Sequence, residues 1–429
     1  MMLITEMVSV SAVTAAGEEN PVNIPTPAST ADPRFPLTLR NGSATFMIAL
    51  ASLMMANLAP FIMTALGALG FDIIASGNIL TWALLASAVV GLASARLASG
   101  RARRPLAMVG LALAAVAFAA AVVPTPAVAV AGLIVGGTGL GAAISTSGAA
   151  IAALRNPNRV SATSGLVNRV LITIVLAVIP IIGITQGSVF SALALISLVG
   201  LALAAWLPDS PEHAEPVDVT SSLQIAEPRR ITIAGIVVLL VFPLWGTSED
   251  AIWTMAPVLG EAVGLGEQPL GFTLSLAAAG GIAGMLIVTV FGNRIGRAAP
   301  LTVALVIGGA LKIWIGFAGD PVLLAVLIIG VSTVYAFAFA LYIATAAGLD
   351  ARGRWSGPLL GAYLVGSSFA PLIGGALIEW FGVPVFTLIT GIVSFAVIAP
   401  TVAIARVSVG AERALARAAA APSATPAGV

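Results

Sequence analysis

The chain has 429 residues, of which 59% are hydrophobic and 9% are charged, and its mean hydropathy is +1.08. About a quarter of the residues of a soluble protein are charged, so this composition excludes a water-soluble globule and indicates an integral membrane protein. The chain has no cysteine and a single histidine, His213, so we expect no metal site and no cofactor; the formal net charge of +1 gives no reason to expect a nucleic-acid partner.

Twelve apolar runs follow one another along the chain, and each is close to the roughly 20 residues that a helix needs to cross a bilayer. The first six cover residues 44–68, 73–95, 105–123, 127–153, 162–184 and 187–207. The second six cover residues 231–257, 269–291, 299–318, 321–347, 356–378 and 383–405. The predicted fold class is therefore an all-α integral membrane protein with twelve transmembrane helices in two six-helix bundles.

The polar segments divide the chain into five parts. Residues 1–43, rich in Pro, Ala, Ser and Thr, are predicted to be a disordered cytoplasmic tail, and an acid ahead of any basic residue argues against a secretory signal. Residues 44–207 are the first bundle, and 208–230, with its acids and prolines, is a solvated cytoplasmic linker. Residues 231–406 are the second bundle, and 407–429 is an Ala-rich cytoplasmic tail with the composition of a short surface helix.

The distribution of charge predicts the topology. Of the 19 Lys and Arg residues, 17 lie in segments that a twelve-helix arrangement with both termini inside places in the cytoplasm. The loops on the other side contain acids and no basic residue: Asp72, Glu261, Glu267, Asp320 and Glu379. Because basic residues flanking a span stay on the cytoplasmic side, we expect a multi-pass protein of the cytoplasmic membrane with both termini in the cytoplasm.

Two short basic loops occupy corresponding places in the two halves. The first, ARLASGRARRPL at 95–106, contains Arg96, Arg101, Arg103 and Arg104, and the second, FGNRIGRAAP at 291–300, contains Asn293, Arg294, Gly296 and Arg297. Both resemble the loop G-x-x-x-D-R-x-G-R-R of the major facilitator superfamily, with Ser99 and Asn293 at the aspartate positions. In that family the acid helps to latch the two halves on the cytoplasmic side, so the latch here is either weaker or built from other residues.

Proline and glycine form a second repeated pattern. VIPIIG at 178–183 and FAPLIGG at 369–375 match with an offset of 191, and their residues are predicted to let helices 5 and 11 bend and pack closely: Pro180, Gly183, Pro371, Gly374 and Gly375. The resemblance associates a G-P-x-x-G-G pattern on helix 5 with exporters that exchange substrate for protons. In this chain the fuller copy lies on helix 11. The two repeats support the parallel six-helix repeats that the resemblance implies.

Two basic residues lie inside predicted helices. Arg169 is ten residues from the cytoplasmic Arg159, about 15 Å along the helix and near the middle of the bilayer. It is a candidate for anion binding or gating, with a structural ion pair as the alternative. Lys312 is eight residues before Asp320, and we expect its long side chain to extend to the outer interface, with a transport role as the weaker alternative.

Candidate residues for the transport site lie mainly on helix 7. PLWGTSEDAIW contains Glu249 and Asp250, one of which is the candidate proton site, and Pro243 and Gly246, which are predicted to open the helix. Possible substrate contacts are Trp245, Tyr335 and Asn57, the last matching Thr247 with an offset of 190. The alternatives are that the acids lie in outer-leaflet water, that the aromatic residues anchor the interface and that Asn57 packs helices.

Function follows partly by elimination. The chain has no G-x-x-x-x-G-K-[ST] loop for ATP and no visible nucleophile and base pair, so we predict that it is not an enzyme. The resemblance implies a secondary active transporter that works by alternating access, and we expect a monomer in the lipid bilayer that exports a small, fairly apolar organic compound in exchange for protons. The alternatives are proton-coupled import of an organic anion held by Arg169, and a transporter-like sensor that moves nothing.

Overall fold

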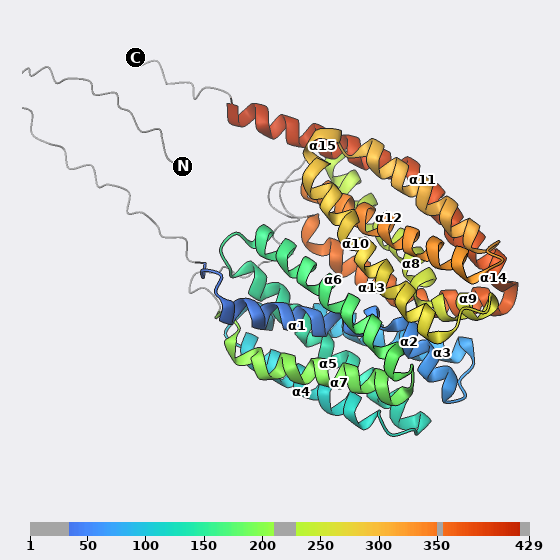
Figure 1. The fold of residues 1–429 in the computed structure, drawn as a ribbon. Helices are drawn as coiled ribbons and strands as arrows, with labels where there is room; N and C mark the ends of the chain where they lie inside the picture. The colour runs from blue at the N-terminus through green and yellow to red at the C-terminus, as the bar shows by residue number, and fades with distance from the viewer. Residues whose placement is uncertain (1–33, 210–228, 350–354, 421–429) are drawn as a thin grey trace, which may run out of the picture. The chain divides into compact units, whose positions relative to one another are not determined.

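The computed structural model describes residues 34–209, 229–349 and 355–420. The described residues leave out most of the predicted N-terminal tail, most of the linker, including His213, and the last nine residues of the C-terminal tail. The described chain is helical, and Figure 1 shows its elements in order.

The first half contains α1 Leu39–Asn57, α2 Ala59–Ala68, α3 Ile73–Ser99, α4 Arg103–Ala120, α5 Pro126–Ala152, α6 Pro157–Ile182, α7 Gln186–Leu203 and the 3-10 turn η1 Ala204–Trp206. The second half contains α8 Arg229–Thr254, α9 Ala256–Ala262, α10 Glu267–Ile295, α11 Ala298–Ile315, α12 Pro321–Ala347, α13 Ser356–Ser368, α14 Ala370–Ala396 and α15 Ile398–Ala420.

These elements make twelve spans. Ten described segments are long and apolar enough to cross a membrane, and α1 with α2, bent by 50°, adds an eleventh. One of the ten, Pro358–Arg413, has 56 residues, which is about 84 Å of helix and far more than one bilayer requires. Gly382, with a φ of 78°, breaks it into two, because this left-handed conformation suits glycine and interrupts a helix. The predicted twelve-helix, all-α fold is confirmed.

The same helix break occurs once in each half. The first span breaks at Leu58, between α1 and α2, and the seventh breaks at Met255, between α8 and α9. Each break is followed two residues later by a proline, Pro60 or Pro257, which lacks an N–H and collides with the carbonyl four residues earlier. The offset of 197 aligns Asn57 with Thr254 and not with Thr247.

Capping residues set the helix starts. α1 begins at Leu39, five residues earlier than predicted, because Thr38 and Asn41 form a reciprocal capping box. Asp72 accepts a hydrogen bond from the Ala75 amide at 2.7 Å, and Asp320 accepts one from the Leu323 amide at 2.9 Å. Two of the acids predicted outside the membrane therefore serve as N-caps. At the other end of the chain, α15 continues to Ala420 and so extends well past the predicted last span.

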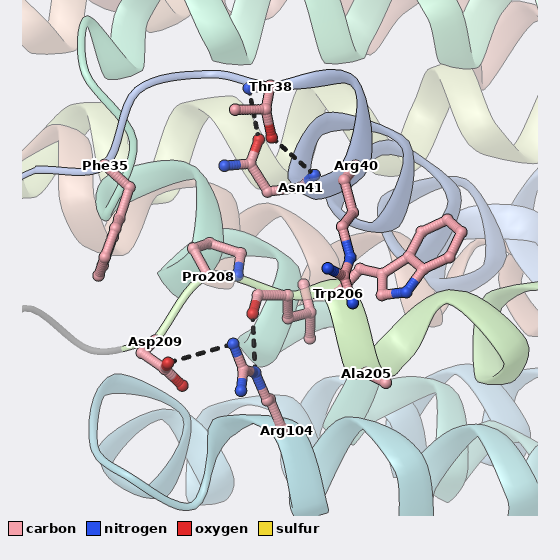
Figure 2. A pocket seen from close by; sticks show the side chains of 10 residues that line it. Phe35, Thr38, Arg40, Asn41, Arg104, Ala205, Trp206, Pro208 and Asp209 are labelled. Atoms are coloured by element: carbon pink, nitrogen blue, oxygen red, sulfur yellow. Dashed lines mark hydrogen bonds and ion pairs between the residues drawn. The ribbon is translucent and has the colours of Figure 1, made fainter.

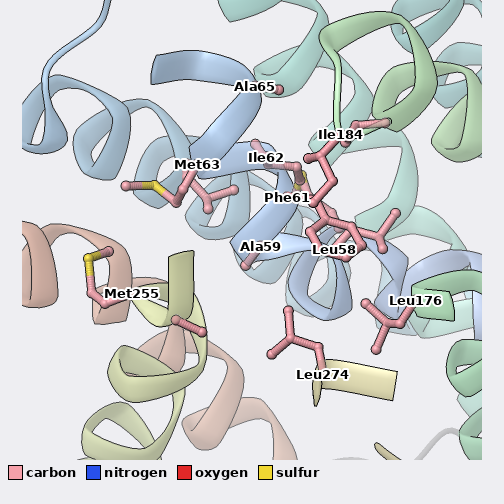
Figure 3. Packing of buried hydrophobic residues seen from close by; sticks show 14 of the residues in the cluster. Leu58, Ala59, Phe61, Ile62, Met63, Ala65, Leu176, Ile184, Met255 and Leu274 are labelled. Atoms are coloured by element: carbon pink, nitrogen blue, oxygen red, sulfur yellow. The ribbon is translucent and has the colours of Figure 1, made fainter. Parts of the chain in front are cut away.

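The buried core differs between the two ends of the helices. We call the end that carries Arg96–Arg104 and Arg297 the basic-loop end. There each half has its own core, with Ala107 and Ala204 in the first half and Leu301 and Ile404 in the second. At the opposite end a single apolar cluster contains residues of both halves, and Figure 3 shows Leu58 and Leu176 of the first half with Leu274 of the second.

The helices that join the halves are α6 with α10, and α3 with α13 and α14. The approach is closest near the opposite end. A Cβ atom on Gly77 would lie 2.6 Å from the Pro371 carbonyl oxygen, and one on Gly271 would lie 1.8 Å from Cγ of Pro180. The halves are therefore held together by a shared core and by glycine contacts at the end opposite the basic loops.

Candidate functional site

A buried ion pair joins α8 to α11. The Nζ atom of Lys312 donates a hydrogen bond to Oε1 of Glu249 at 2.8 Å and to Oγ of Ser248 at 3.0 Å. The side chains of Lys312 and Glu249 are 0% and 5% exposed. The expectation that Lys312 extends to the interface is therefore wrong. An ammonium group with no exposed surface requires a counter-charge, and the neighbouring helix supplies it.

The second acid, Asp250, has a different set of partners. Its Oδ2 atom accepts hydrogen bonds from the hydroxyl of Tyr363, at 2.7 Å, and from the hydroxyl of Ser367, both on α13. The Tyr363 hydroxyl also lies 2.6 Å from the hydroxyl of Tyr335 on α12. Asp250 is partly exposed. Adjacent residues on a helix point about 100° apart, and here one acid points to a cation and the other to a chain of neutral hydroxyls.

Gly246 makes room for this chain of hydroxyls. A Cβ atom on Gly246 would lie 2.4 Å from Cε2 of Tyr363, so only glycine lets the tyrosine ring lie against α8. The prediction that Pro243 and Gly246 open the helix is wrong, because α8 runs unbroken through both. The Thr247 hydroxyl donates to the Pro243 carbonyl at 2.8 Å, and the break comes only at Met255.

Aromatic rings of the second half surround the tyrosine pair. The Trp245 ring stacks on Tyr335 with centroids 5.4 Å apart and planes 28° apart. Phe339 lies 5.6 Å from Tyr335 and 5.2 Å from Tyr363. Trp245 is 2% exposed, whereas Tyr335, Phe339 and Tyr363 are partly exposed. Trp245 therefore supports the ring of Tyr335 from behind, and the direct substrate contact predicted for Trp245 is not available in this conformation.

Arg169 reaches this group from the first half. A Cβ atom on Gly281 of α10 would lie 3.5 Å from the guanidinium carbon of Arg169 and 3.4 Å from Cβ of Ala336, the residue after Tyr335. No acid of the described chain lies within 4.0 Å of the Arg169 guanidinium. The cation predicted at mid-membrane therefore lies near the hydroxyl chain without a carboxylate of its own.

Asn57 lies elsewhere in the interface between the halves. It is the last residue of α1, beside the break at Leu58, and its backbone carbonyl accepts a hydrogen bond from the indole of Trp253 at 3.3 Å. Trp253 is partly buried against the shared core. This contact connects the two halves.

The two basic loops bind the end of their own half. Arg103 donates to the carbonyls of Pro208 and Asp209 at 2.9 and 3.0 Å. Arg104 pairs with the Asp209 carboxylate at 3.1 Å. In the second half, Arg297 donates to the Ser408 hydroxyl at 2.7 Å and to Glu412 at 2.5 Å. Each of these contacts joins two residues of the same half, and none of them joins the two halves.

The remaining loop residues differ in what the structure describes. Arg96 is exposed in the last turn of α3, and Gly296 ends α10 with a φ of 71°. The side chains of Asn293 and Arg294 lie outside the described part of the chain.

The proline and glycine motifs lie where the halves meet. Pro180 packs on Gly271, and the Pro371 carbonyl lies over Gly77. A Cβ atom on Gly375 would lie 2.9 Å from the Ile73 carbonyl oxygen. At these positions the helices approach so closely that a Cβ atom on the glycine would collide with the neighbouring chain.

The other two glycines of these motifs have separate roles. A Cβ atom on Gly374 would lie 2.9 Å from Cγ of Met255 on the other side of its helix. Gly183 ends α6 with a φ of 105°.

Sequence reasoning missed three members of the site. Lys312 was recognised as unusual but not connected to Glu249, and Tyr363 and Ser367 were not singled out. The spacing of Tyr363 and Ser367 places both on one face of α13, and this pair of hydroxyls in an apolar helix is the signal that could have found them.

Comparison with known proteins identifies the family. The model of the Major Facilitator Superfamily matches residues 44–349. No curated protein matches the chain. Among solved structures, the chain is similar to a D-xylose-proton symporter (TM-score 0.68, 14% identity, 85% of this chain and 96% of that chain). It is also similar to the nucleoside transporter NupG (0.67, 14%, 86% and 99%) and to the human organic anion transporter MFSD10 (0.63, 16%, 84% and 99%).

These structures share the fold of this chain at low sequence identity. The family match covers the first half and the second half as far as Leu349, and it includes the first basic loop, Arg169, the two acids of α8 and Lys312. The chain is therefore a multi-pass membrane transporter that belongs to the Major Facilitator Superfamily.

Proposed function

We propose that the protein is a proton-coupled exporter of a small, fairly apolar organic compound, and that Asp250 carries the proton. The observation that carries the assignment is the different pairing of the two adjacent acids. Glu249 is held by a buried ammonium group, whereas Asp250 is held by neutral hydroxyls. Protonating Glu249 would leave Lys312 as a buried cation without a counter-charge, which is costly. Protonating Asp250 breaks no ion pair, because its hydrogen-bond partners are neutral hydroxyls.

The surroundings of Asp250 support the substrate class. Tyr335, Phe339 and Tyr363 present aromatic surface with two hydroxyls, which suits an organic compound with a few polar groups. The shared core at the opposite end supports alternating access, in which the site opens to one side at a time. With the basic loops in the cytoplasm, the described conformation is closed on the outside.

The test is transport in proteoliposomes with an imposed pH gradient, with apolar fluorescent dyes and aromatic carboxylates as probes. Asp250→Asn is expected to abolish proton-driven flux and to retain exchange of substrate for substrate. The matched control is the double variant Glu249→Gln with Lys312→Met, which removes the other acid together with its cation and is expected to retain proton-driven flux. Loss of proton-driven flux in the control, with retention in Asp250→Asn, would assign the proton to Glu249.

A second candidate is proton-coupled import of an organic anion. The observation that favours it is Arg169, which lies near the hydroxyl chain and pairs with no acid of the described chain. Inward flux of an aromatic carboxylate down the proton gradient, lost in Arg169→Gln, would support import over export. Binding of a probe without flux under any gradient would support the sensor and refute both transport proposals.

A further inference from the structure

A pocket of about 430 Å³ lies at the basic-loop end of the first half, away from the transport site. Its walls are the segment that leads into α1, the first turn of α4 and the chain that follows α7. Figure 2 shows its lining, with Arg40, Arg104 and Asp209 around the same opening. The polar lining joins three segments that are far apart in the sequence.

The pocket has one positive charge more than it has negative charges. Arg104 is already held, because it donates to the Leu207 carbonyl at 2.8 Å and pairs with Asp209 at 3.1 Å. The Arg40 guanidinium lies over the Trp206 ring, 5.4 Å from its centroid. This stacking orients the guanidinium, and no acid of the described residues lies within 4.0 Å of it. The planar fork of Arg40 is therefore available for an oxyanion.

Apolar surface adjoins these charges. Leu39 is 92% exposed, Leu37 is 46% exposed and Trp206 is 39% exposed. Both α1 and α4 begin here as membrane spans, so the pocket lies at the level of the lipid headgroups. A guanidinium beside exposed leucine and tryptophan matches a molecule that is anionic at one end and apolar at the other.

We propose that this pocket binds a phosphate group, and that the phosphate belongs to an acidic phospholipid of the adjoining leaflet. Arg40 forks onto the phosphate oxygens, and the free N–H groups of Arg104 make a second contact. Bound in this way, the lipid joins the start of α1 to the start of α4 and stabilises the first half.

The test uses the full-length protein in detergent micelles, titrated with phosphatidylglycerol or with phosphatidylcholine, and follows the midpoint of thermal unfolding. The variant is Arg40→Gln, and the matched control is Arg101→Gln, which removes one exposed arginine of the same end that does not line the pocket. Arg40→Gln is expected to raise the phosphatidylglycerol concentration that gives half of the stabilisation more than about tenfold. Arg101→Gln is expected to raise that concentration by at most roughly fivefold. Equal midpoints in phosphatidylcholine show that both variants fold.

Three results would overturn the proposal. If Arg40→Gln and Arg101→Gln weaken the response equally, the basic end attracts acidic lipid without using the pocket. If phosphatidylcholine stabilises the wild type as well as phosphatidylglycerol does, the net negative charge is not recognised. If millimolar inorganic phosphate in phosphatidylcholine reproduces the shift and Arg40→Gln abolishes it, the pocket takes a soluble phosphate and the assignment to a lipid is wrong.

Discussion

Removing the ammonium group of Lys312 is predicted to be one of the most damaging single changes in the second half. Lys312→Met keeps an unbranched side chain of similar length and leaves Glu249, which is 5% exposed, without its cation. One oxygen of Glu249, Oε2, is already buried without a hydrogen-bond partner among the described residues. Losing one partner of such a pair costs about 3–5 kcal/mol, because an uncompensated charge stays buried.

The assay is the free energy of unfolding in mixed micelles of dodecyl maltoside and SDS. Lys312→Met and Glu249→Gln are each expected to lose about 3 kcal/mol or more, and the double variant to recover most of it, since no unpaired charge remains. Glu412→Gln is the control, because it breaks the more exposed pair with Arg297 and should cost less than about 1 kcal/mol. A loss below about 1 kcal/mol for Lys312→Met, or a double variant no better than the singles, would refute the reasoning.

Two further predictions concern glycines. Gly271→Val places a side chain against Pro180 and should shift the population away from the described conformation. Because the wild type has no cysteine, the shift is measured in a Met255→Cys background as faster alkylation of that single cysteine. An unchanged alkylation rate would contradict the prediction. Gly246→Ala places a Cβ atom against the Tyr363 ring and should lower proton-driven flux at least tenfold, about 1.4 kcal/mol, and also lower the melting midpoint, because the added atom overpacks the site; full flux would show that Tyr363 does not position Asp250.

The sequence predicts the spans well because a span is a local property. Hydropathy marks each apolar run, and the basic loops mark one end of the bundle. The ends of the helices were less accurate. Thr38 extends α1 beyond the apolar run. The helix opening predicted at Pro243 occurs instead at Met255, two residues before Pro257. Pro243 stays inside an unbroken α8, so a proline in an apolar run does not by itself locate a break.

The site was predictable only in part, because its pairing is not local. Glu249 and Asp250 are adjacent in sequence and chemically alike, and nothing near them distinguishes their partners. Lys312 is 63 residues from Glu249, and Tyr363 is 113 residues from Asp250. Which helices are neighbours depends on the packing of the second half, which the hydropathy pattern does not contain. Arg169 was recognised because a charge near the middle of a span is conspicuous by itself.

The shared core has a consequence for the temperature dependence of transport. Opening the end opposite the basic loops separates Leu58 and Leu176 from Leu274 and admits water to their surfaces. Hydration of apolar surface raises the heat capacity, so the free energy of this opening curves with temperature. At the basic-loop end each half keeps its own core, and the charged loops offer less apolar surface to bury in exchange. Because apolar contacts weaken on cooling, the conformation that is open at the end opposite the basic loops should gain population in the cold.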